Sequence, residues 1–432
     1  MNITSFIARR VAASGQKSFS RLIIRIAITS VALGVAVMIL ATALISGFKN
    51  EISSKIFGFW GHIHITDSGL NRSLLDAYPI SQEQDFYPSL DTIDSVPYPV
   101  TEHWLGMEVE KIATTNGGIK HIQVFALKPG IIKVKSEIEG IILKGVGADF
   151  DWTFIQDYLQ DGEVLAWQDT VANKGILLSQ QTANRLRVKV GDSFIIHFPE
   201  RDGNILKKRF KVSGIYKTGL EEYDSKFALV DIRQLRQLLK WRDDEISGFE
   251  VFIDDLNDLD IIADYIYYDR MPARLIAETI RDKFPEIFDW LELQDINEIV
   301  ILGLMVIVAI INMITALMIL ILERANMIGT LKALGGSNWA IQKIFLYYAG
   351  NIILYGLFWG NLIGLGLGFL QDQFGIIQLS EADYYLSVAP VHFDLWSILG
   401  INIGTLTIIL IFLIVPSFLV TSISPVKAIR FK

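Results

Sequence analysis

The sequence predicts an α-helical membrane protein with four transmembrane helices and a large α+β domain inserted between helices 1 and 2. Hydrophobic residues make up 51% of the 432 positions and charged residues 20%, so apolar and polar parts must be segregated along the chain. The apolar residues gather into four runs, each longer than the roughly 20 residues that a helix needs to cross a bilayer. These runs are 22–48, 299–322, 341–370 and 396–420.

Basic residues in the short flanks predict the side of the membrane on which each part lies, because Lys and Arg resist translocation. The first 25 residues contain five basic residues and neither Asp nor Glu, which places the N-terminus, 1–21, in the cytoplasm. After four crossings the C-terminus, 421–432, is cytoplasmic too. The connection 323–340 carries Arg324 and Lys332, whereas 371–395 carries four acidic residues and no basic one. The domain at 49–298 is therefore predicted to lie outside the cytoplasm.

The first two spans are predicted to continue beyond the membrane as amphipathic helices. Apolar residues recur every four positions from Phe48 to Ile56, and they have helical spacing from Trp290 to Ile296. We expect these two stalks to hold the outer domain. The stalks are 49–58 and 286–298.

Between the stalks the signals are mostly those of strands, bounded by turn residues. Strands are predicted at 61–66, 119–127, 191–198, 209–216 and 249–253, and helices at 179–186, 231–239 and 272–284. The segment 68–99 is rich in Asp, Ser and Pro and is predicted to be irregular. The mixture indicates an α+β domain with two lobes.

Motifs that carry enzyme chemistry are absent from the sequence. It contains no G-x-x-x-x-G-K-[ST], H-E-x-x-H or G-x-S-x-G, and no cysteine, so we predict no catalytic residue, disulfide or thiolate metal site. His62 and His64 share one face of a predicted strand and could bind a metal, but without a third ligand we interpret them as strand residues. The net charge of -8 offers no footprint for nucleic acid. We expect no metal or cofactor in this chain.

Glycines at intervals of four mark the third span. Gly356, Gly360, Gly364 and Gly368 line one helix face with no side chains, so another helix can approach closely. That helix could belong to the same chain or to a second copy. In the fourth span, Pro416 lacks an N–H group and predicts a kink or a local break.

A short charged insert, E-R-A-N-M-I-G-T-L-K-A-L-G-G-S, separates the second and third spans from Glu323 to Ser337. As a helix it would carry an apolar stripe, and Gly335-Gly336 would supply a left-handed stop. The helix could lie in the headgroup layer, or it could fit a groove on a cytoplasmic partner and pass force to the spans. The stripe consists of Met327, Ile328, Leu331 and Leu334.

This insert resembles the coupling segment of FtsX-like and MacB-like ABC transporter permeases, in which an acidic and basic pair, a glycine and an L-K-A-L-G-x-S ending recur. Members of that family have a large periplasmic domain between the first two of their spans, and a separate ATPase docks on this helix. The resemblance implies ATPase-coupling roles for Glu323, Arg324, Met327, Ile328, Leu331, Lys332, Leu334 and Gly335.

Within this family, several stretches resemble the lipoprotein-releasing, or Lol-type, permeases. They are I-S-G-F-K-N-E-I-S-S-K-I-F-G after the first span, F-K-V-S-G-I-Y-K-T-G-L-E-E-Y-D-S-K-F-A-L-V at 210–230, Y-Y-L-S-V-A-P-V at 384–391 and the terminal S-P-V-K-A-I-R-F-K. The stretch at 210–230 discriminates best, because it lies in the outer domain. Between Phe198 and Phe210, the sequence P-E-R-D-G-N-I-L-K-K is shorter and more polar than the hook with which one kind of Lol permease captures a chaperone.

The resemblance implies a multi-pass permease subunit of the bacterial inner membrane that extracts lipoproteins by mechanotransmission for sorting to the outer membrane. Its implied partners are a cytoplasmic ABC ATPase that binds ATP and Mg²⁺, a second permease copy or a sister permease, the lipoprotein, and a periplasmic lipoprotein chaperone. Acyl chains would contact apolar faces at Ala43, Phe48, Ile52, Ile299 and Leu302. The alternatives are an efflux permease of the MacB kind and a regulator of a cell-wall hydrolase of the FtsX kind.

Overall fold

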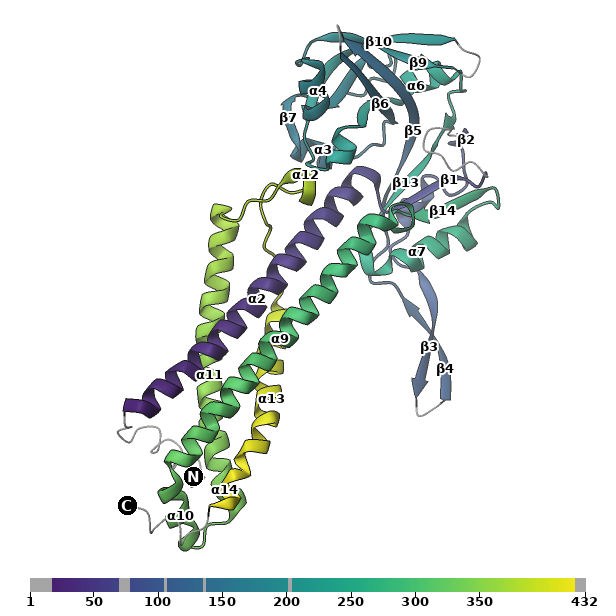
Figure 1. Ribbon diagram of the computed structural model, residues 1–432. Coiled ribbons are helices and arrows are strands. Elements are labelled where there is room, and N and C mark those ends of the chain that lie inside the picture. Colours follow the sequence, from purple (N-terminus) through teal and green to yellow (C-terminus); the bar gives the residue numbers. More distant parts are fainter. Residues whose placement is uncertain (1–17, 70–77, 105–106, 135–136, 201–203, 424–432) are drawn as a thin grey trace. The chain divides into compact units, whose positions relative to one another are not determined.

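The structure is a computed structural model that describes residues 18–69, 78–104, 107–134, 137–200 and 204–423 (Figure 1). Residues 1–17 and 424–432, which include most of both predicted cytoplasmic termini, lie outside the described residues. The chain divides into two compact units. Unit 1 comprises Met1–Glu51, Asp289–Gln378 and Val388–Lys432, and unit 2 comprises Ile52–Phe288 and Leu379–Ser387.

The described helices are α2 (Ser18–Trp60), α3 (Thr153–Asp157), α4 (Gln180–Leu186), α5 (Glu221–Asp224), α6 (Ile232–Leu239), α7 (Leu259–Tyr265), α8 (Ile280–Lys283), α9 (Pro285–Glu323), α10 (Ala325–Ala333), α11 (Asn338–Phe374), α12 (Glu381–Tyr384), α13 (Leu395–Ser417) and α14 (Leu419–Ser422). Short 3-10 turns occur at Ser89–Thr92 and Leu256–Asp258, and a π-helical turn occurs at Ile266–Arg270.

The described strands are β1 (Ile63–Asp67), β2 (Ile80–Ser81), β3 (Pro97–Trp104), β4 (Met107–Thr114), β5 (Ile119–Val134), β6 (Glu137–Val146), β7 (Leu159–Gly162), β8 (Gly175–Ser179), β9 (Ser193–Pro199), β10 (Ile205–Tyr216), β11 (Phe227–Asp231), β12 (Glu245–Ile246), β13 (Gly248–Ile253) and β14 (Leu275–Thr279).

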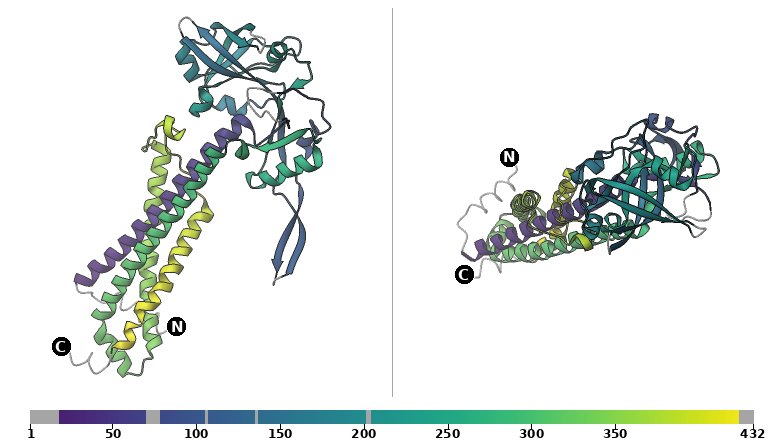
Figure 2. Two further views of the ribbon diagram at one scale, coloured as in Figure 1. Left: turned by 45° about the vertical axis from the view of Figure 1, so that its right-hand side comes forward. Right: turned by 90° about the horizontal axis from the view of Figure 1, so that it is seen from above.

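Unit 1 is a bundle of long helices that run side by side in the views of Figures 1 and 2. Within the described residues, four helices are long and apolar enough to cross a membrane, namely Arg21–Trp60, Pro285–Glu323, Asn338–Phe374 and Leu395–Ser422, and each contains one predicted span. Both α2 and α9 are continuous through their predicted stalks. The break predicted at Pro416 is confirmed, because α13 ends at Ser417 and α14 begins at Leu419.

Unit 2 is organised by a ten-stranded sheet in the order β14-β1-β13-β5-β6-β11-β8-β10-β7, in which β9 pairs with both β10 and β5. The pairings of β9 close the strands from β5 to β10 into a ring, and β13, β1 and β14 extend from β5 as an open part. The 16-residue strand β5 belongs to both parts, since Ile119–Phe125 pairs with β13 and Phe125–Val134 pairs with β6. Gly130 permits the closure, because an added Cβ would lie 2.8 Å from atoms of Ile196 and Phe198.

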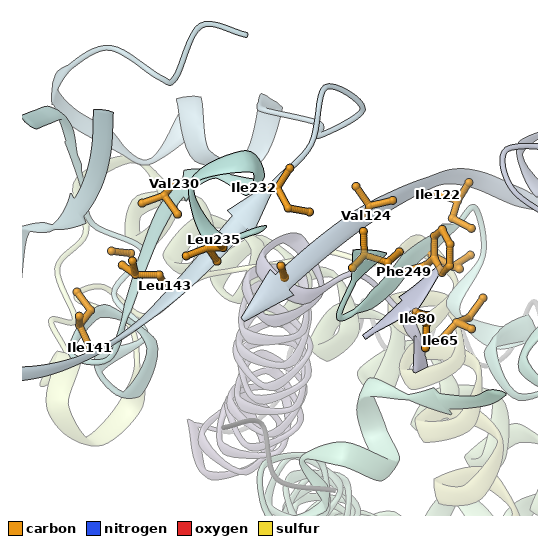
Figure 3. Close-up of a cluster of buried hydrophobic side chains, with 14 of the residues drawn as sticks. Ile65, Ile80, Ile122, Val124, Ile141, Leu143, Val230, Ile232, Leu235 and Phe249 are labelled. Carbon is orange, nitrogen blue, oxygen red and sulfur yellow. The ribbon is translucent and has the colours of Figure 1, made fainter. Parts of the chain in front are cut away.

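One hydrophobic core runs along both parts of the sheet (Figure 3). The short strands β8 and β11 are buried along their whole length, as expected for central strands whose two faces are both covered. Figure 3 labels Ile65, Ile80, Ile122, Val124, Ile141, Leu143, Val230, Ile232, Leu235 and Phe249.

The prediction of a helix at 272–284 is wrong for most of these residues. Its first part, Leu275–Thr279, is strand β14, which pairs with β1 along the edge of the sheet. Only the end is helical: Thr279 and Asp282 form a capping box that begins α8. The backbone N–H and C=O groups on the outer edge of β1 bond to this segment, and these hydrogen bonds stabilise a strand there although the local sequence pattern favours a helix.

The segment 68–99, predicted to be irregular, contains strand β2, the 3-10 turn Ser89–Thr92 and the start of a β-hairpin at Pro97, and the prediction is wrong for these residues. Strands β3 and β4 pair along their length, from Pro97 with Thr114 to Trp104 with Met107, as a separate two-stranded sheet. Figure 1 shows the hairpin extending away from the main sheet of unit 2.

Candidate functional site

The predicted coupling insert forms helix α10 between α9 and α11. It ends in a Schellman motif, in which Gly336 N–H donates to Leu331 O (2.9 Å) and Gly335 N–H donates to Lys332 O (3.0 Å). Gly335 has a φ of +89°, which glycine adopts without strain. Ser337 then caps α11 by accepting the Ala340 N–H at 3.3 Å. The four residues L-G-G-S thus form the whole turn between α10, which ends at Ala333, and α11, which begins at Asn338.

The apolar stripe of α10 packs mainly against the helix bundle of its own unit. Ile328 is completely buried in the bundle core, and Met327 and Leu331 pack against that core while half-buried. Leu334, in contrast, is 80% exposed. The structure therefore does not bring the four stripe residues to one outer surface. Ile328 cannot contact lipid or a groove on a partner unless the side chains of the bundle core rearrange.

The outward face of α10 is mixed. Asn326, Thr330 and Ala333 are exposed at helical spacing, preceded by exposed Glu323 at the end of α9 and followed by exposed Leu334 and Gly335. Lys332 is half-buried, and its Nζ donates to Thr421 O (3.1 Å) and Ile423 O (2.9 Å). A lysine at this position ties α10 to the carbonyl groups that end α14. Arg324 is half-buried at the junction with α9.

The glycine face of α11 lies against α2 of the same chain. A Cβ on Gly356 would lie 2.6 Å from Val31, one on Gly360 would lie 2.7 Å from Val35, and one on Gly364 would lie 3.2 Å from Ala36. Gly368 differs, because it faces the ring of Phe393 in the following loop. Three of the four glycines thus allow two membrane helices to pack closely.

The residues predicted to contact acyl chains do not form one surface. Ala43 and Ile52 are buried within the chain, at 3% and 0% exposure. Phe48 packs edge-on against Trp290 at 5.4 Å, and Leu302 packs against the bundle core. Ile299 alone of the five is open to the outside, with 69% of its surface exposed.

Polar contacts join α2 to α9 along their length within unit 1. Thr42 Oγ1 donates to Glu298 Oε1 at 2.7 Å, and Lys49 Nζ lies 2.6 Å from Asp295 Oδ1. Deeper in the bundle, Asn312 Nδ2 donates to Ser30 Oγ. Such contacts are each worth little in energy, but they fix the register of the two helices.

A buried charged cluster lies in unit 2 between the sheet, the end of α2 and α8. Lys144 Nζ lies 2.8 Å from Glu250 Oε1, and neither side chain has any exposed surface. Lys144 also donates to Phe59 O, at the end of α2, and lies 4.9 Å and 5.0 Å from the ring centroids of Phe59 and Trp60. The ammonium group is therefore surrounded by a carboxylate, a carbonyl and two aromatic faces.

Sheet register assembles the rest of this cluster. His64 of β1 stands opposite Glu250 of β13, which stands opposite Gln123 of β5, so their side chains lie in a row on one face. Gln123 Nε2 donates to Glu250 Oε2 at 2.8 Å. His64 Nε2 lies 2.7 Å from Trp60 O, and Lys283 Nζ of α8 donates to His64 Nδ1 at 2.8 Å. The cluster thus joins the end of α2 to the helix that leads into α9.

Electrostatics in the cluster follow from burial. Burial raises the pKa of Glu250, and the neighbouring Lys144 opposes that change. Burial also lowers the pKa of Lys144, opposed by Glu250. The pKa of His64 is well below its usual value because of burial and Lys283, which matches a neutral ring that donates from Nε2 and accepts at Nδ1. The ion pair is stable here only because each charged group has its partners.

The two histidines considered as metal ligands have structural partners instead. Both ring nitrogens of His64 are engaged within the cluster. His62 precedes β1, and its Nδ1 accepts the Ile253 N–H at 2.8 Å. Burial, with a contribution from Lys120, lowers the pKa of His62 to about 4. These contacts favour the interpretation of both residues as part of the strand framework.

The segment Leu379–Ser387, which we call the strap, belongs to unit 2 although the chain on either side of it belongs to unit 1. Glu381 of the strap pairs with Lys217 at 2.8 Å, and Tyr385 O accepts from Lys55 Nζ at 3.5 Å. Leu386 is buried. The strap also places Tyr385, from the stretch 384–391, beside Gly219 of the stretch 210–230, since a Cβ added to Gly219 would lie 3.2 Å from Tyr385 O.

Lys55 is buried although the first stalk's pattern predicts exposure. It lies outside the apolar stripe of Phe48, Ile52 and Ile56, yet it is only 7% exposed. Its ammonium lies 5.4 Å from the Tyr158 ring centroid and beside the strap. A third connection to the sheet domain, besides the two stalks, is thus found only in the tertiary structure.

Comparisons with known proteins bear on these features. The MacB-like periplasmic core domain matches residues 26–266, more than half of the chain, and the FtsX-like permease C-terminal domain matches residues 299–425. The chain is 23% identical to "Lipoprotein-releasing system transmembrane protein LolE" of Haemophilus influenzae over 99% of each protein. It is 22% identical to "Lipoprotein-releasing system transmembrane protein LolC" of Xylella fastidiosa over 98% of this chain and 97% of that protein.

Among solved structures, the extracellular domain of the ABC-type transporter YknZ from Gram-positive bacteria matches 50% of this chain and 98% of that domain. The sequence identity is 14% and the TM-score is 0.30.

Replacing Gly360 with Leu should prevent close packing of α11 on α2. The new side chain would meet Val35 and the Ala32 carbonyl, so we expect a loss of about 1–3 kcal/mol or more in stability. Gly366→Leu on the same helix is the matched control, because a Cβ there meets nothing within 4 Å. Thermal unfolding of both full-length variants in detergent would measure the difference, and equal midpoints would contradict the packing.

Replacing Glu250 with Gln should destabilise unit 2 by about 3–5 kcal/mol, since it leaves the Lys144 ammonium buried without a counter-ion. Tryptophan fluorescence during thermal unfolding of the full-length protein would detect a lower midpoint. Adding Lys144→Met should recover much of the loss, because the double variant has no unpaired charge. Arg274→Gln serves as the control, since its side chain is 74% exposed beside Asp67 and such pairs contribute about 0–1 kcal/mol.

Proposed function

This chain belongs to the family of FtsX-like and MacB-like ABC transporter permeases, and on that premise we propose that it is the permease subunit of a transporter that extracts lipoproteins from the inner membrane. The observation that carries the proposal is the similarity, over nearly the whole of each chain, to transmembrane proteins of lipoprotein-releasing systems. We place both termini and α10 in the cytoplasm and unit 2 in the periplasm. In this proposal the chain itself is not catalytic.

Energy would come from a partner ABC ATPase, which binds ATP and Mg²⁺ and docks on the outward face of α10. The packing of α10 supports this role, because Ile328 in the bundle core and Lys332 on α14 hold the helix firmly. A push on α10 then moves the bundle as one body. Packed interiors transmit such displacement because they are hardly compressible.

Movement would reach the periplasmic domain through α2 and α9. Both helices are uninterrupted, and the α2 end and the α8 segment before α9 meet in the cluster of Lys144, Glu250 and His64. The cluster is a rigid attachment, since opening it would expose unpaired buried charges. A second permease, identical or a sister chain, would supply the opposing pair of helices.

Acyl chains would bind the open apolar face of α9. Leu293, Ile296, Ile299 and Val300 are 53–69% exposed, and the first two lie in the stalk beyond the predicted span. An acyl chain sliding along this face would remain covered while it leaves the bilayer, at roughly 25 cal/mol per Å² buried. Ile299 is kept as an acyl contact on this basis, whereas the burial of Ala43 and Ile52 removes them from this surface.

Leu334→Glu should weaken ATPase docking without unfolding the permease. The side chain is 80% exposed just after α10, so a charge there leaves the bundle intact, and we expect the affinity for the ATPase to fall roughly tenfold, about 1.4 kcal/mol. Copurification of the ATPase with tagged permease measures the effect. Ile112→Glu, at an 81% exposed position of unit 2, is the control. Undiminished copurification of the Leu334 variant would place the docking surface elsewhere.

Depletion of the protein tests the proposed function directly. Mature lipoproteins should accumulate in the inner membrane fraction, and re-expression of the wild-type chain, but not of the Leu334→Glu chain, should restore their sorting. Normal sorting in a cell without a compensating sister permease would refute lipoprotein extraction. Drug sensitivity without missorting would then favour the efflux alternative, and a cell-wall defect alone would favour hydrolase regulation.

A further inference from the structure

The loop that carries the strap is fastened to the helix bundle at its base. Gln371, near the end of α11, is buried, and its Nε2 donates to Ile377 O (3.3 Å) and Ala389 O (2.9 Å). Its Oε1 accepts the Ile377 N–H at 2.8 Å. One buried amide thus holds the chain segments on both sides of the strap. Opening this base would leave buried polar groups without partners, so the base moves with α11.

The same loop is also fastened to α2 within unit 1. His392 N–H donates to Ala43 O at 2.9 Å. Gly47 makes the close approach possible, since an added Cβ would lie 2.6 Å from Pro390 O. The base of the strap is therefore continuous with two packed helices of the bundle.

The tip of the strap is attached to the rest of unit 2 by weaker contacts. The side chains of the Lys217–Glu381 pair are 39% and 38% exposed, so water already competes for both charges. Lys55 Nζ lies 3.5 Å from Tyr385 O, which is a long hydrogen bond. Leu386 adds one buried apolar side chain. These contacts can separate without breaking a closed polar network.

Detachment of the tip would not leave a buried charge without compensation. Lys55 has the Tyr158 ring 5.4 Å away, and that ring belongs to the sheet side of the contact. Burial raises the pKa of the Asp224 carboxyl, and Lys55 is among the groups that oppose the rise. Both neighbours stay with Lys55 when the strap leaves. The Lys144–Glu250 cluster differs, because its charges are enclosed on every side.

We propose that the strap is a releasable latch, docked on unit 2 in one state of the transport cycle and detached in another, while its base stays fixed to α11. The inference rests on the proposed function, in which the stalk helices move unit 2. Docked, the strap restrains that movement; detached, it leaves unit 2 on its two stalks. The trigger is displacement of α10 by the ATPase, because α10 and α11 share one packed core.

Distances between spin labels test the latch in the full-length permease–ATPase complex, with a cysteine-free ATPase, in lipid nanodiscs. The chain has no cysteine, so labels attach to it only at Asp383→Cys of the strap and Asn184→Cys of α4, both exposed positions. The long-distance population should rise roughly fivefold when vanadate traps the nucleotide. Asn184→Cys with Arg274→Cys, neither in the strap, is the control pair and should not change. Identical Asp383–Asn184 distances in both states would overturn the latch.

Reversing one charge of the pair tests the contact that holds the tip. Lys217→Glu places two carboxylates together, so the detached population without nucleotide should rise roughly fivefold. Adding Glu381→Lys restores opposite charges and should return the population to that of the wild type. Lys240→Glu, at a 74% exposed position, is the control. An unchanged population in Lys217→Glu, or no recovery in the double variant, would overturn the assigned contact.

A reducible linker between Lys217→Cys and Glu381→Cys should lock the strap on unit 2. The linked complex should hydrolyse ATP but lose ATP-dependent release of a fluorescent, triacylated Cys-Ser-Lys-Lys-Lys-Lys peptide from the nanodiscs, and reductant should restore release. Release at the rate of the unlinked double variant would overturn the latch. Strap movement in a wild-type complex that releases no lipopeptide would support the latch and count against the proposed function.

Discussion

The ion pair of Lys144 and Glu250 is the constraint on which the architecture of unit 2 depends. Two fully buried charges are tolerated only when they are paired and hydrogen-bonded. Here the groups around the pair come from β1, β5, β6, β13, α8 and the end of α2. Glu250 Oε1 has the ionic contact with Lys144, whereas the buried Trp60 Nε1 has no hydrogen-bond partner among the described residues. The pair therefore connects the sheet to the end of α2 and, through His64 and Lys283, to α8, the short helix that precedes α9.

The helix bundle of unit 1 obtains its coherence in a different way. Glycines let α11 approach α2, and a few polar contacts set the register of α2 on α9. Dispersion over many close contacts stabilises such a bundle, since lipid offers no hydrophobic driving force between helices. The apolar stripe of α10 adds this helix to the same packed body. What remains outward is Asn326, Thr330 and Ala333, with Leu334 after the end of the helix.

Sequence patterns predicted the elements whose structure is decided locally. The spans, stalks, Pro416 break and Gly335-Gly336 stop all follow from hydropathy, helix period or backbone freedom. Errors arose where a distant partner decided. Residues 275–279 became strand β14 because β1 had an open edge, and Lys55 became buried because the strap covers it. A helical period shows that a residue lies on a given face, but not what lies opposite that face.

The sequence by itself determined the four apolar helices, the short helix between the second and third of them and the resemblance to a transporter family, because these depend on composition, spacing and contiguous motifs. Tertiary structure alone decided which faces are used. It placed Ile328 inside the bundle, lined up His64, Glu250 and Gln123 through strand register, and brought Glu381 beside Lys217. Each of these contacts joins residues that are far apart in the chain. They form because strand pairing and side-chain packing depend on the whole fold.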